Sequence, residues 1–487
     1  MTSVRRGLAG LMFWGICLMN RAWWRFGTRL LTTVTALAAA SVAIPAEAGA
    51  GGPGDLRVES YILPVGAAKP SLEDLQSGSG MQRLRDLVAQ TEPGARLPLE
   101  TAGPAASYAQ LSHKPSGMTQ SAPVAQAVGP SVAAPEPART MTFEECKKGL
   151  GSDKSFFVKS RFAVCNGASF LQTWMRNNKP VGESMFNVRV VGTIAKNSRV
   201  INFQYYFTDF ITTGTTGASA MSITTKGNIP QSWPAGAKYT RGGKMPGTKT
   251  FAQLKVQRTF TETVTAKTGQ GSMKALDLLF AVYEPAISYT PPPGWTLRGA
   301  LGGKLFMLAP RWESASYLAN STGGGKPEKK GAATFSYLTT LTLSAKQGAA
   351  EQAEAAHIRQ AFLVPQDTKP YMSAKKVPGQ TAKDPLHRTV SQARNDKNRA
   401  AAVKQCKRYW GPKYTNGGKE CDEYPFASTY EGAAEPEFDQ EAKKFNFSAK
   451  PIPKDDNQAG GLILKSFYGK NRIIDGLDDG FLVKIVS

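Results

Sequence analysis

The chain has few of the residues that build nitrogen- and sulfur-ligated metal sites. Its 487 residues include only three histidines and five cysteines, and no pair of cysteines has a C-x2-C spacing. A structural zinc site is therefore a weak alternative for this sequence. Acidic residues are also scarce, with 37 Asp and Glu against 60 Lys and Arg, which gives a formal charge of +23. This excess of base indicates a polyanionic partner, namely nucleic acid, an anionic envelope polymer or an acidic membrane surface.

Long apolar runs are absent beyond the N-terminal segment. No later stretch contains eighteen consecutive apolar residues, a length that a membrane-spanning helix needs. We therefore expect no stable membrane insertion once the N-terminal segment has been removed. The hydrophobic content of 41% excludes a wholly disordered polyelectrolyte, and the length predicts two or three domains.

The N-terminal segment has the features of an export signal. Arginines precede an apolar run at residues 30–44, and Ala46-Glu47-Ala48 then offers an A-x-A cleavage site. Because the run is shorter than an ordinary membrane-spanning helix, we interpret residues 1–48 as a signal peptide. The protein is then expected to be secreted and extracellular. An uncleaved membrane anchor is the alternative.

Cysteine usage agrees with export. Removal of residues 1–48 leaves Cys146, Cys165, Cys406 and Cys421, which form two pairs that are close in sequence. In an oxidising compartment, Cys146–Cys165 and Cys406–Cys421 are the most economical disulfides, although four cysteines permit three pairings. A disulfide that closes a loop of about 15 residues stabilises a protein by roughly 3 kcal/mol.

Composition divides the rest of the chain into four segments. Residues 49–139 are rich in Ala, Pro, Gly and Ser, and are predicted to be a linker or pro-segment with one short helix near residues 81–90. Residues 140–363 are predicted to be a β-rich domain, and residues 364–374 a linker. Residues 375–487 are predicted to form a compact C-terminal domain.

The β-rich segment alternates between apolar and polar side chains, as from Phe186 to Gly192, and turn residues separate these stretches. The pattern is typical of an antiparallel, sandwich-like structure. A helix is expected near residues 345–363. The segment shows no catalytic constellation, so two roles stay open: a module that binds cell-wall or envelope polymer or DNA, and a structural or secretion-related domain.

Basic and acidic residues are unevenly distributed along residues 375–487. Residues 375–419 contain 12 bases and 2 acids, whereas residues 420–487 contain 8 bases and 13 acids. A metal-dependent nuclease needs such an arrangement, because bases hold phosphates and carboxylates hold the cation that activates water. Two solvated faces of opposite charge are the simpler explanation, so charge alone does not decide the function.

An acidic loop follows a basic helix in this unit. The stretch 389–408 lacks Gly and Pro and predicts a helix with Thr389 or Ser391 as its N-cap. Asp422 and Glu431 lie in the segment that follows, which is predicted to be a loop. They are candidates to hold one divalent ion, because hard cations prefer oxygen ligands.

The end of the chain predicts a further helix and a final strand. Asn457 is a natural N-cap for a helix at residues 458–470, and the free N–H groups at that helix N-terminus could bind a phosphate. Plain capping is the alternative explanation. A strand at residues 480–486 completes a small α+β unit. The expected fold class is thus multidomain, with a β-rich, sandwich-like middle domain and a small disulfide-bonded α+β domain at the C-terminus.

Residues 375–487 resemble the NucA/NucB-type deoxyribonuclease domain of secreted bacterial nucleases. The matching segments are His387-Arg388-Thr389, Asn398-Arg399, Cys421-Asp-Glu-Tyr-Pro-Phe-Ala-Ser-Thr, Tyr430-Glu431-Gly432, Asn457-Gln-Ala-Gly-Gly and Asn471-Arg-Ile-Ile-Asp-Gly. The resemblance covers about 110 residues, which is less than a quarter of the chain.

The resemblance implies divalent-metal-dependent, endonucleolytic cleavage of DNA outside the cell, with Mg²⁺ or Mn²⁺ as the cation. It makes Asp422 the first catalytic candidate, as general base or metal ligand, and Glu423 the next. It places Glu431 and Asn457 at positions for metal or phosphate contact, and His387 is a candidate general base. The candidates for substrate binding are Arg388, Arg399, Asn457, Asn471 and Arg472.

Three functions are consistent with these features. The first is a secreted nuclease that degrades environmental DNA with little sequence preference. The second is an exported antibacterial toxin with an N-terminal delivery region, which would have an immunity protein as a partner. The third is a non-catalytic basic protein that binds the envelope or DNA. Because Asp422, Glu423 and Glu431 are all present, the sequence favours nuclease activity, with DNA as the substrate.

Overall fold

A computed structural model describes residues 55–95, 132–151, 156–271, 276–299, 302–305, 307–321 and 330–487. The predicted signal peptide lies outside the described residues. No helix in the described ranges combines the length and the apolar character that crossing a membrane requires.

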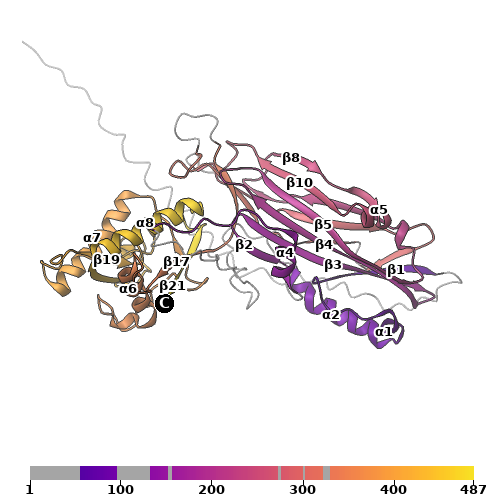
Figure 1. The fold of residues 1–487 in the computed structure, drawn as a ribbon, viewed down its shortest axis with the longest axis horizontal. Coiled ribbons are helices and arrows are strands. Elements are labelled where there is room, and N and C mark those ends of the chain that lie inside the picture. Colours follow the sequence, from indigo (N-terminus) through magenta and orange to yellow (C-terminus); the bar gives the residue numbers. More distant parts are fainter. Residues whose placement is uncertain are drawn as a thin grey trace, which may run out of the picture. The chain divides into compact units, whose positions relative to one another are not determined.

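The largest sheet of the β-rich region has eight strands (Figure 1). Seven of them follow the order β13 (Thr296–Gly299), β1 (Leu56–Leu63), β3 (Ala163–Arg176), β4 (Lys179–Ile194), β5 (Ile201–Gly214), β10 (Thr259–Ala266) and β8 (Tyr239–Lys244). The eighth strand, β2 (Phe156–Ser160), pairs with β3. Only the β1–β13 pair is parallel among the described pairs of this sheet.

Two four-stranded sheets complete the β-rich region. One has the order β16 (Ala332–Phe335), β15 (Pro310–Glu313), β11 (Leu279–Ala281) and β7 (Ser232–Trp233), and the other β14 (Gly302–Lys304), β12 (Glu284–Thr290), β6 (Ser222–Asn228) and β9 (Gly247–Thr250). The helices of this region are α1 (Leu72–Gln76), α2 (Ser79–Ala95), α4 (Phe143–Leu150), η1 (Ala218–Ala220) and α5 (Phe251–Val256).

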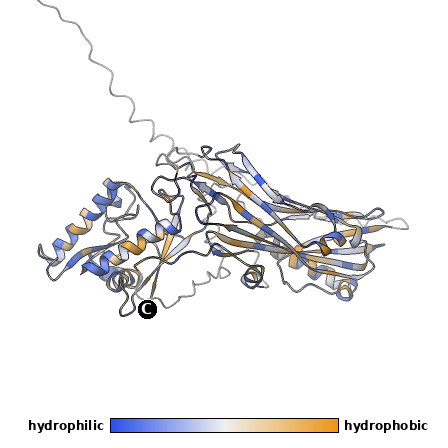
Figure 2. Ribbon diagram, turned by 45° about the horizontal axis from the view of Figure 1, so that its top comes forward, coloured by the Kyte–Doolittle hydropathy of each residue, from blue (hydrophilic) through white to orange (hydrophobic). Residues whose placement is uncertain are grey.

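The three sheets share one hydrophobic core. Phe186 of β4, Ile287 of β12 and Trp312 of β15 are all buried in it. Hydrophobic and hydrophilic residues are interleaved along the long strands (Figure 2), which is the alternation that the sequence shows. The predicted β-rich, multi-sheet middle region is therefore confirmed.

The β-rich region begins earlier in the chain than the sequence predicts. Strand β1 lies within the stretch 49–139, which was interpreted as a linker, and it pairs with β3 along its whole length. Val58 and Leu63 of β1 are buried. The predicted helix near residues 81–90 lies within α2. The linker interpretation is thus wrong for residues 56–95. It relied on the composition of the whole stretch 49–139, which the Ala- and Pro-rich residues after α2 dominate, so the alternating pattern of the single strand β1 was not recognised.

The C-terminal unit, which we define as residues 339–487, has an α+β fold. Its elements are β17 (Thr339–Ser344), α6 (Gln352–Leu363), η2 (Pro365–Asp367), β18 (Leu386–His387), α7 (Gln392–Trp410), β19 (Lys419–Tyr424), η3 (Glu435–Glu437), β20 (Ser448–Pro453), α8 (Lys454–Lys470) and β21 (Gly480–Val486). Strand β21 lies between β17 and β18, and β19 pairs with β20 in an antiparallel hairpin.

Strand β17 and helix α6 belong to this unit, although the sequence analysis assigned them to the β-rich domain. Leu341 of β17 and Ile358 of α6 share a core with Tyr424 of β19, Phe467 of α8 and Phe481 of β21. The residues after α6 are also packed, because the backbone N–H of Ala449 on β20 donates to the carbonyl of Lys369. Local sequence could not show this assignment, because it depends on a parallel pairing between β17 and β21, which lie about 140 residues apart.

Buried ion pairs join the β-rich region to the C-terminal unit. Arg161, at the turn between β2 and β3, and Arg311 of β15 both pair with the carboxylate of Asp479. Arg472 pairs with Glu313 of β15. All five side chains are almost fully buried, at 2% exposure or less. The loop between α8 and β21 is therefore fixed against the β-rich region by charges that water does not reach.

Candidate active site

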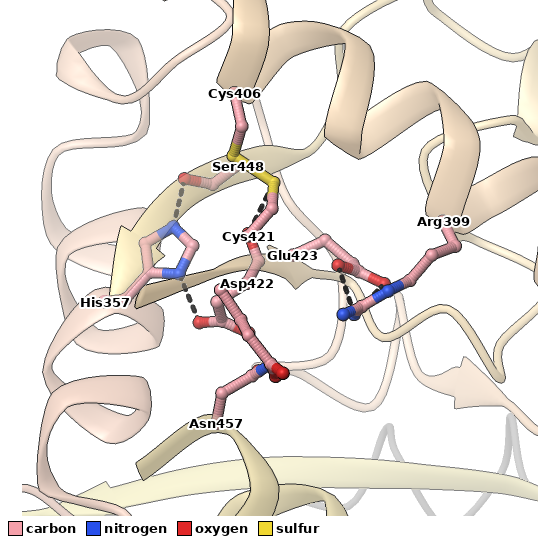
Figure 3. Close-up of a disulfide and its surroundings, with 9 residues drawn as sticks. His357, Arg399, Cys406, Cys421, Asp422, Glu423, Ser448 and Asn457 are labelled. Atoms are coloured by element: carbon pink, nitrogen blue, oxygen red, sulfur yellow. Dashed lines mark hydrogen bonds and ion pairs between the residues drawn. A yellow bond between two sulfur atoms is a disulfide. The ribbon is translucent and has the colours of Figure 1, made fainter. Parts of the chain in front are cut away.

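Strand β19 is packed between helices on both of its sides. Helix α7 lies against one side, and α6 and α8 approach the other. Because side chains alternate along a strand, Cys421 and Glu423 point towards α7, and Asp422 points towards α6 (Figure 3). Glu420 lies on the same side of the strand as Asp422 and contacts α8. The two adjacent acids, Asp422 and Glu423, therefore have different partners.

Asp422 is held by a histidine from α6. The Nδ1 atom of His357 lies 2.6 Å from Asp422 Oδ2, and its Nε2 atom lies 2.7 Å from the hydroxyl of Ser448 on β20 (Figure 3). His357 is 1% exposed and Asp422 is 4% exposed. A neutral imidazole satisfies both contacts when Nδ1–H donates to Asp422 and Nε2 accepts from Ser448. No hydrogen bond within the described residues involves the other oxygen of Asp422, Oδ1.

A second carboxylate from α6 lies beside this pair. Glu354 is 3% exposed, and its Oε2 atom has no hydrogen-bond partner within the described residues. Burial raises the pKa of Glu354 well above its ordinary value, and the nearby carboxylates of Asp422 and Glu423 raise it further. A Cβ atom at Gly460 of α8 would overlap the carboxylate of Glu354, so the glycine leaves room for that carboxylate where the two helices meet. The site thus contains two buried carboxyl groups, those of Asp422 and Glu354, and Glu354 Oε2 has no hydrogen-bond donor within the described residues.

Glu423 forms an ion pair on the α7 side of the strand. Both of its carboxylate oxygens accept hydrogen bonds from Arg399 Nη1, at 3.2 and 3.1 Å. Burial raises the pKa of Glu423 to about 7, although the charge of Arg399 opposes this shift. The side chain of Arg399 remains 45% exposed, so its guanidinium can still reach a ligand outside the protein.

Asn457 lies inside a helix and is not an N-cap. Helix α8 begins at Lys454, with Pro453 as its N-cap, so the prediction of a capping Asn457 with free N–H groups is wrong. Proline suits a helix start and acidic residues suit the first turn, which here contains Asp455 and Asp456. The Asn457 amide instead donates to Glu420 Oε2 of β19 at 2.9 Å. This contact brings Asn457 to the same side of the strand as Asp422.

Glu431 pairs with His387, the histidine that the sequence analysis selected. Its Oε1 atom lies 2.7 Å from His387 Nδ1, and its Oε2 atom accepts the backbone N–H of His387 at 2.9 Å. Both side chains are partly exposed, at 12% for Glu431 and 17% for His387. The sequence analysis paired Glu431 with Asp422 on one ion. The structure gives the two acids different histidine partners, and no hydrogen bond within the described residues joins them.

Three predicted substrate-binding residues are engaged inside the protein. The guanidinium of Arg388 lies 4.7 Å from the ring centroids of both Tyr317 and Tyr468, and it donates to the carbonyl of Ile473. Asn471 is 7% exposed and donates to a carbonyl of α8. Arg472 is 2% exposed and pairs with Glu313. The prediction that Asn471 and Arg472 contact substrate does not fit this structure, because the β-rich region covers them.

Both predicted disulfides are present. Cys146 of α4 bonds to Cys165 of β3, and Cys406 of α7 bonds to Cys421 of β19. The second disulfide is next to Asp422 in sequence and ties the last turns of α7 to the strand that carries this acid (Figure 3). Ser391 is the N-cap of α7, as predicted, and accepts from the backbone N–H of Arg394.

Replacement of Cys406 and Cys421 by serine should lower the free energy of unfolding by about 3 kcal/mol, because the disulfide closes a loop in the unfolded chain. Urea denaturation of the full-length protein would measure the change. The matched control replaces Cys146 and Cys165, which should give a similar loss of stability without disturbing β19. An unchanged midpoint in the first variant would contradict the stabilising role of the Cys406–Cys421 disulfide.

Strand β19 lies in a stretch of sequence that matches a known protein family. Residues 371–483 match the family model of deoxyribonuclease NucA/NucB. The resemblance that the sequence motifs indicate is therefore confirmed for the C-terminal part of the chain. Comparisons with curated proteins and with solved structures gave no significant match. We call residues 371–483 the NucA/NucB region.

The structure adds residues that the sequence analysis did not select. Glu354 and His357 precede the NucA/NucB region, yet both lie against Asp422, and Glu420 and Ser448 complete its surroundings. One signal for them was available, because Glu354 and His357 are three residues apart and so share one face of an Ala-rich helix. Within the described residues, no three His, Cys, Asp or Glu side chains are placed to hold a metal ion together.

Proposed function

We propose that this protein is an exported, divalent-metal-dependent endonuclease that hydrolyses the phosphodiester bonds of DNA with little sequence preference. One observation carries the proposal: Asp422 lies on a strand of the NucA/NucB region and is fixed by His357, with oxygen-bearing side chains around it. A carboxylate that is oriented by a buried histidine suits proton transfer from a water molecule.

Each residue around β19 then has a defined task. Asp422 accepts a proton from the attacking water through the oxygen that His357 leaves free. His357 holds the Asp422 carboxylate in one orientation, and Ser448 fixes the imidazole in turn. Arg399, which is partly exposed, contacts a phosphate of the bound DNA. Because such contacts do not read base edges, cleavage should have little sequence preference and should weaken as salt concentration rises.

The residues near Asp422 fit a hard divalent cation. Glu354 has a buried carboxylate oxygen without a hydrogen-bond partner, and other carboxylates raise its pKa, so a positive charge there would relieve their repulsion. Asp422, Asn457 and Glu354 would hold Mg²⁺ or Mn²⁺, which binds through few protein oxygens together with water and substrate phosphate. When bound, the cation would lower the pKa of a water molecule and neutralise charge on the phosphate.

Two features support export. The N-terminal residues have the pattern of a signal peptide, and two disulfides are typical of proteins that fold in oxidising compartments. We therefore propose that the protein acts on DNA outside the cell that makes it.

Cleavage of supercoiled plasmid by the oxidised full-length protein tests the proposal. In Mg²⁺ or Mn²⁺ the plasmid should be nicked and then degraded to fragments of many lengths. EDTA should lower the rate by about a hundredfold or more, because a catalytic metal supplies several kcal/mol, and added Mg²⁺ should restore it. If the plasmid stays intact in all conditions although the protein is correctly folded, the proposal is contradicted.

A further inference from the structure

Three large aromatic side chains are exposed around the C-terminal end of α7. Tyr371 is 59% exposed, Tyr409 is 37% exposed and Trp410 is 42% exposed. The rings of Tyr409 and Trp410 lie 6.1 Å apart, and the backbone N–H of Tyr371 donates to the Tyr409 hydroxyl at 3.4 Å. We call these three residues the aromatic platform. A group of rings left in water at one place on a surface is typical of a binding site.

The aromatic platform is held in place by its surroundings. Cys406, in the last turns of α7, is fixed to β19 by its disulfide. The segment that carries Tyr371 is braced by the buried ammonium of Lys375, which donates to the carbonyl and hydroxyl of Thr368 and to the carbonyl of Pro370. The rings are therefore presented on a rigid support, which lowers the entropy lost when a ligand binds.

Positive charges surround the platform and continue along α7. Lys369 Nζ lies 5.9 Å from the Tyr371 ring and 5.6 Å from the Tyr409 ring, and the Arg408 guanidinium lies 5.7 Å from the Tyr409 ring. Four bases of α7 share one face of the helix because of their spacing. They are Arg394, Lys397, Lys404 and Arg408; Arg394 also donates to the carbonyl of Tyr430, and Lys397 pairs with Glu437. This basic stripe extends over about 21 Å, at 1.5 Å per residue.

We propose that the aromatic platform and the basic stripe bind single-stranded DNA. Unpaired bases would stack on the rings, while the phosphates would follow the stripe, as in sequence-independent single-strand binding. Duplex DNA fits this surface less well, since its base faces are already covered by neighbouring base pairs. The inference rests on the proposed nuclease function and names its preferred substrate form. The Cys406–Cys421 disulfide connects α7, which carries Tyr409 and Trp410, to the strand that carries Asp422.

The test measures binding by the full-length protein in EDTA, so that no cleavage occurs. The probes are a fluorescein-labelled oligothymidylate and a duplex of the same length, followed by fluorescence anisotropy. The variant with Tyr371→Ala and Trp410→Ala should raise the Kd for the oligothymidylate about tenfold or more, because each stacked base contributes roughly 1–3 kcal/mol. Its Kd for the duplex should change less than twofold.

Two further variants separate stacking from charge and from folding. Tyr371→Phe with Trp410→Phe keeps the rings and should bind the oligothymidylate within about threefold of the wild type. Lys404→Ala with Arg408→Ala removes two phosphate contacts, and should reduce the slope of log K against log salt by about 1.4 for single strands. The matched control is Leu477→Ala, an exposed apolar residue outside the platform, which should leave both Kd values unchanged.

The inference is overturned if the Tyr371→Ala, Trp410→Ala variant binds the oligothymidylate like the wild type. It is also overturned if the affinity for single strand and duplex falls equally, because the rings would then not contact bases. These results are distinguishable from failure of the nuclease proposal, since binding is measured without turnover. If the wild type binds single strands through the aromatic platform but cleaves no DNA, the nuclease function is contradicted and the binding role of the platform is supported.

Discussion

Replacement of Asp422 by asparagine should lower the rate of DNA cleavage about a thousandfold. Loss of a positioned general base typically costs a hundred- to ten-thousandfold in rate, and Asp422 is the acid that His357 orients. Asparagine has nearly the same shape and keeps an oxygen that accepts the His357 Nδ1–H, so the fold should be preserved. Initial rates of plasmid nicking in saturating Mg²⁺ would measure the effect, with a thermal melt to check folding.

The matched control for this experiment is Glu423→Gln. Glu423 is the next residue, is equally buried and points to Arg399 on the other side of β19. We expect this variant to lose no more than about tenfold in rate, because it affects an ion pair and leaves the proton acceptor in place. If Asp422→Asn keeps more than a tenth of the wild-type rate, the proton acceptor lies elsewhere, and the partly exposed His387–Glu431 pair becomes the next candidate.

Replacement of Asp479 by alanine should lower the free energy of unfolding by about 3–5 kcal/mol. The change leaves Arg161 and Arg311 buried without their shared carboxylate, and an uncompensated buried charge costs that much. Urea denaturation followed by tryptophan fluorescence would measure the loss. Asp478→Ala is the matched control, because burial and the charge of Asp479 raise the pKa of Asp478, so its carboxylate adds little stability.

The contribution of Asp479 should depend on pH in a defined direction. Burial alone would raise its pKa, but the charges of Arg161 and Arg311 outweigh burial and lower it below the ordinary value of about 3.9. The carboxyl group of Asp479 therefore binds a proton more weakly in the folded than in the unfolded state. Its contribution to the free energy of unfolding is complete above about pH 4. The stability difference between wild type and Asp479→Ala should be constant from pH 5 to 8 and should shrink as the pH falls below 4. A difference that grows in acid would contradict the ion pairs.

Local patterns in the sequence were sufficient for much of the C-terminal unit. Cysteine spacing predicted the Cys406–Cys421 disulfide, and the absence of Gly and Pro predicted α7, whose N-cap is Ser391, one of the two residues predicted for that position. The motif around Asp422 predicted the family that residues 371–483 match. Each of these features depends on residues close together in the chain, where spacing and conformational preference act directly.

Contacts between distant segments could not be predicted in this way. His357 and Asp422 are 65 residues apart, and they meet because α6 packs against α8, β20 and the β17–β21 pair. The burial of Arg472 depends on Glu313, which is 159 residues away. Asn457 was predicted as an N-cap because Asn is favoured there, but Pro453 starts the helix one turn earlier. Such outcomes are decided by tertiary packing and not by the local sequence.

The position of β21 in the sheet has a consequence for the order of events during synthesis. This strand lies between β17 and β18, and Phe481 and Val483 complete the core that Ile358 and Tyr424 share. Of all the elements of the C-terminal unit, β21 leaves the ribosome last. While a chain is still growing, the parallel pairing of β17 with β21 cannot form, so the core that α6 shares with β19 and α8 lacks Phe481 and Val483. The surroundings of His357 and Asp422 are therefore completed only when residues 480–486 have emerged.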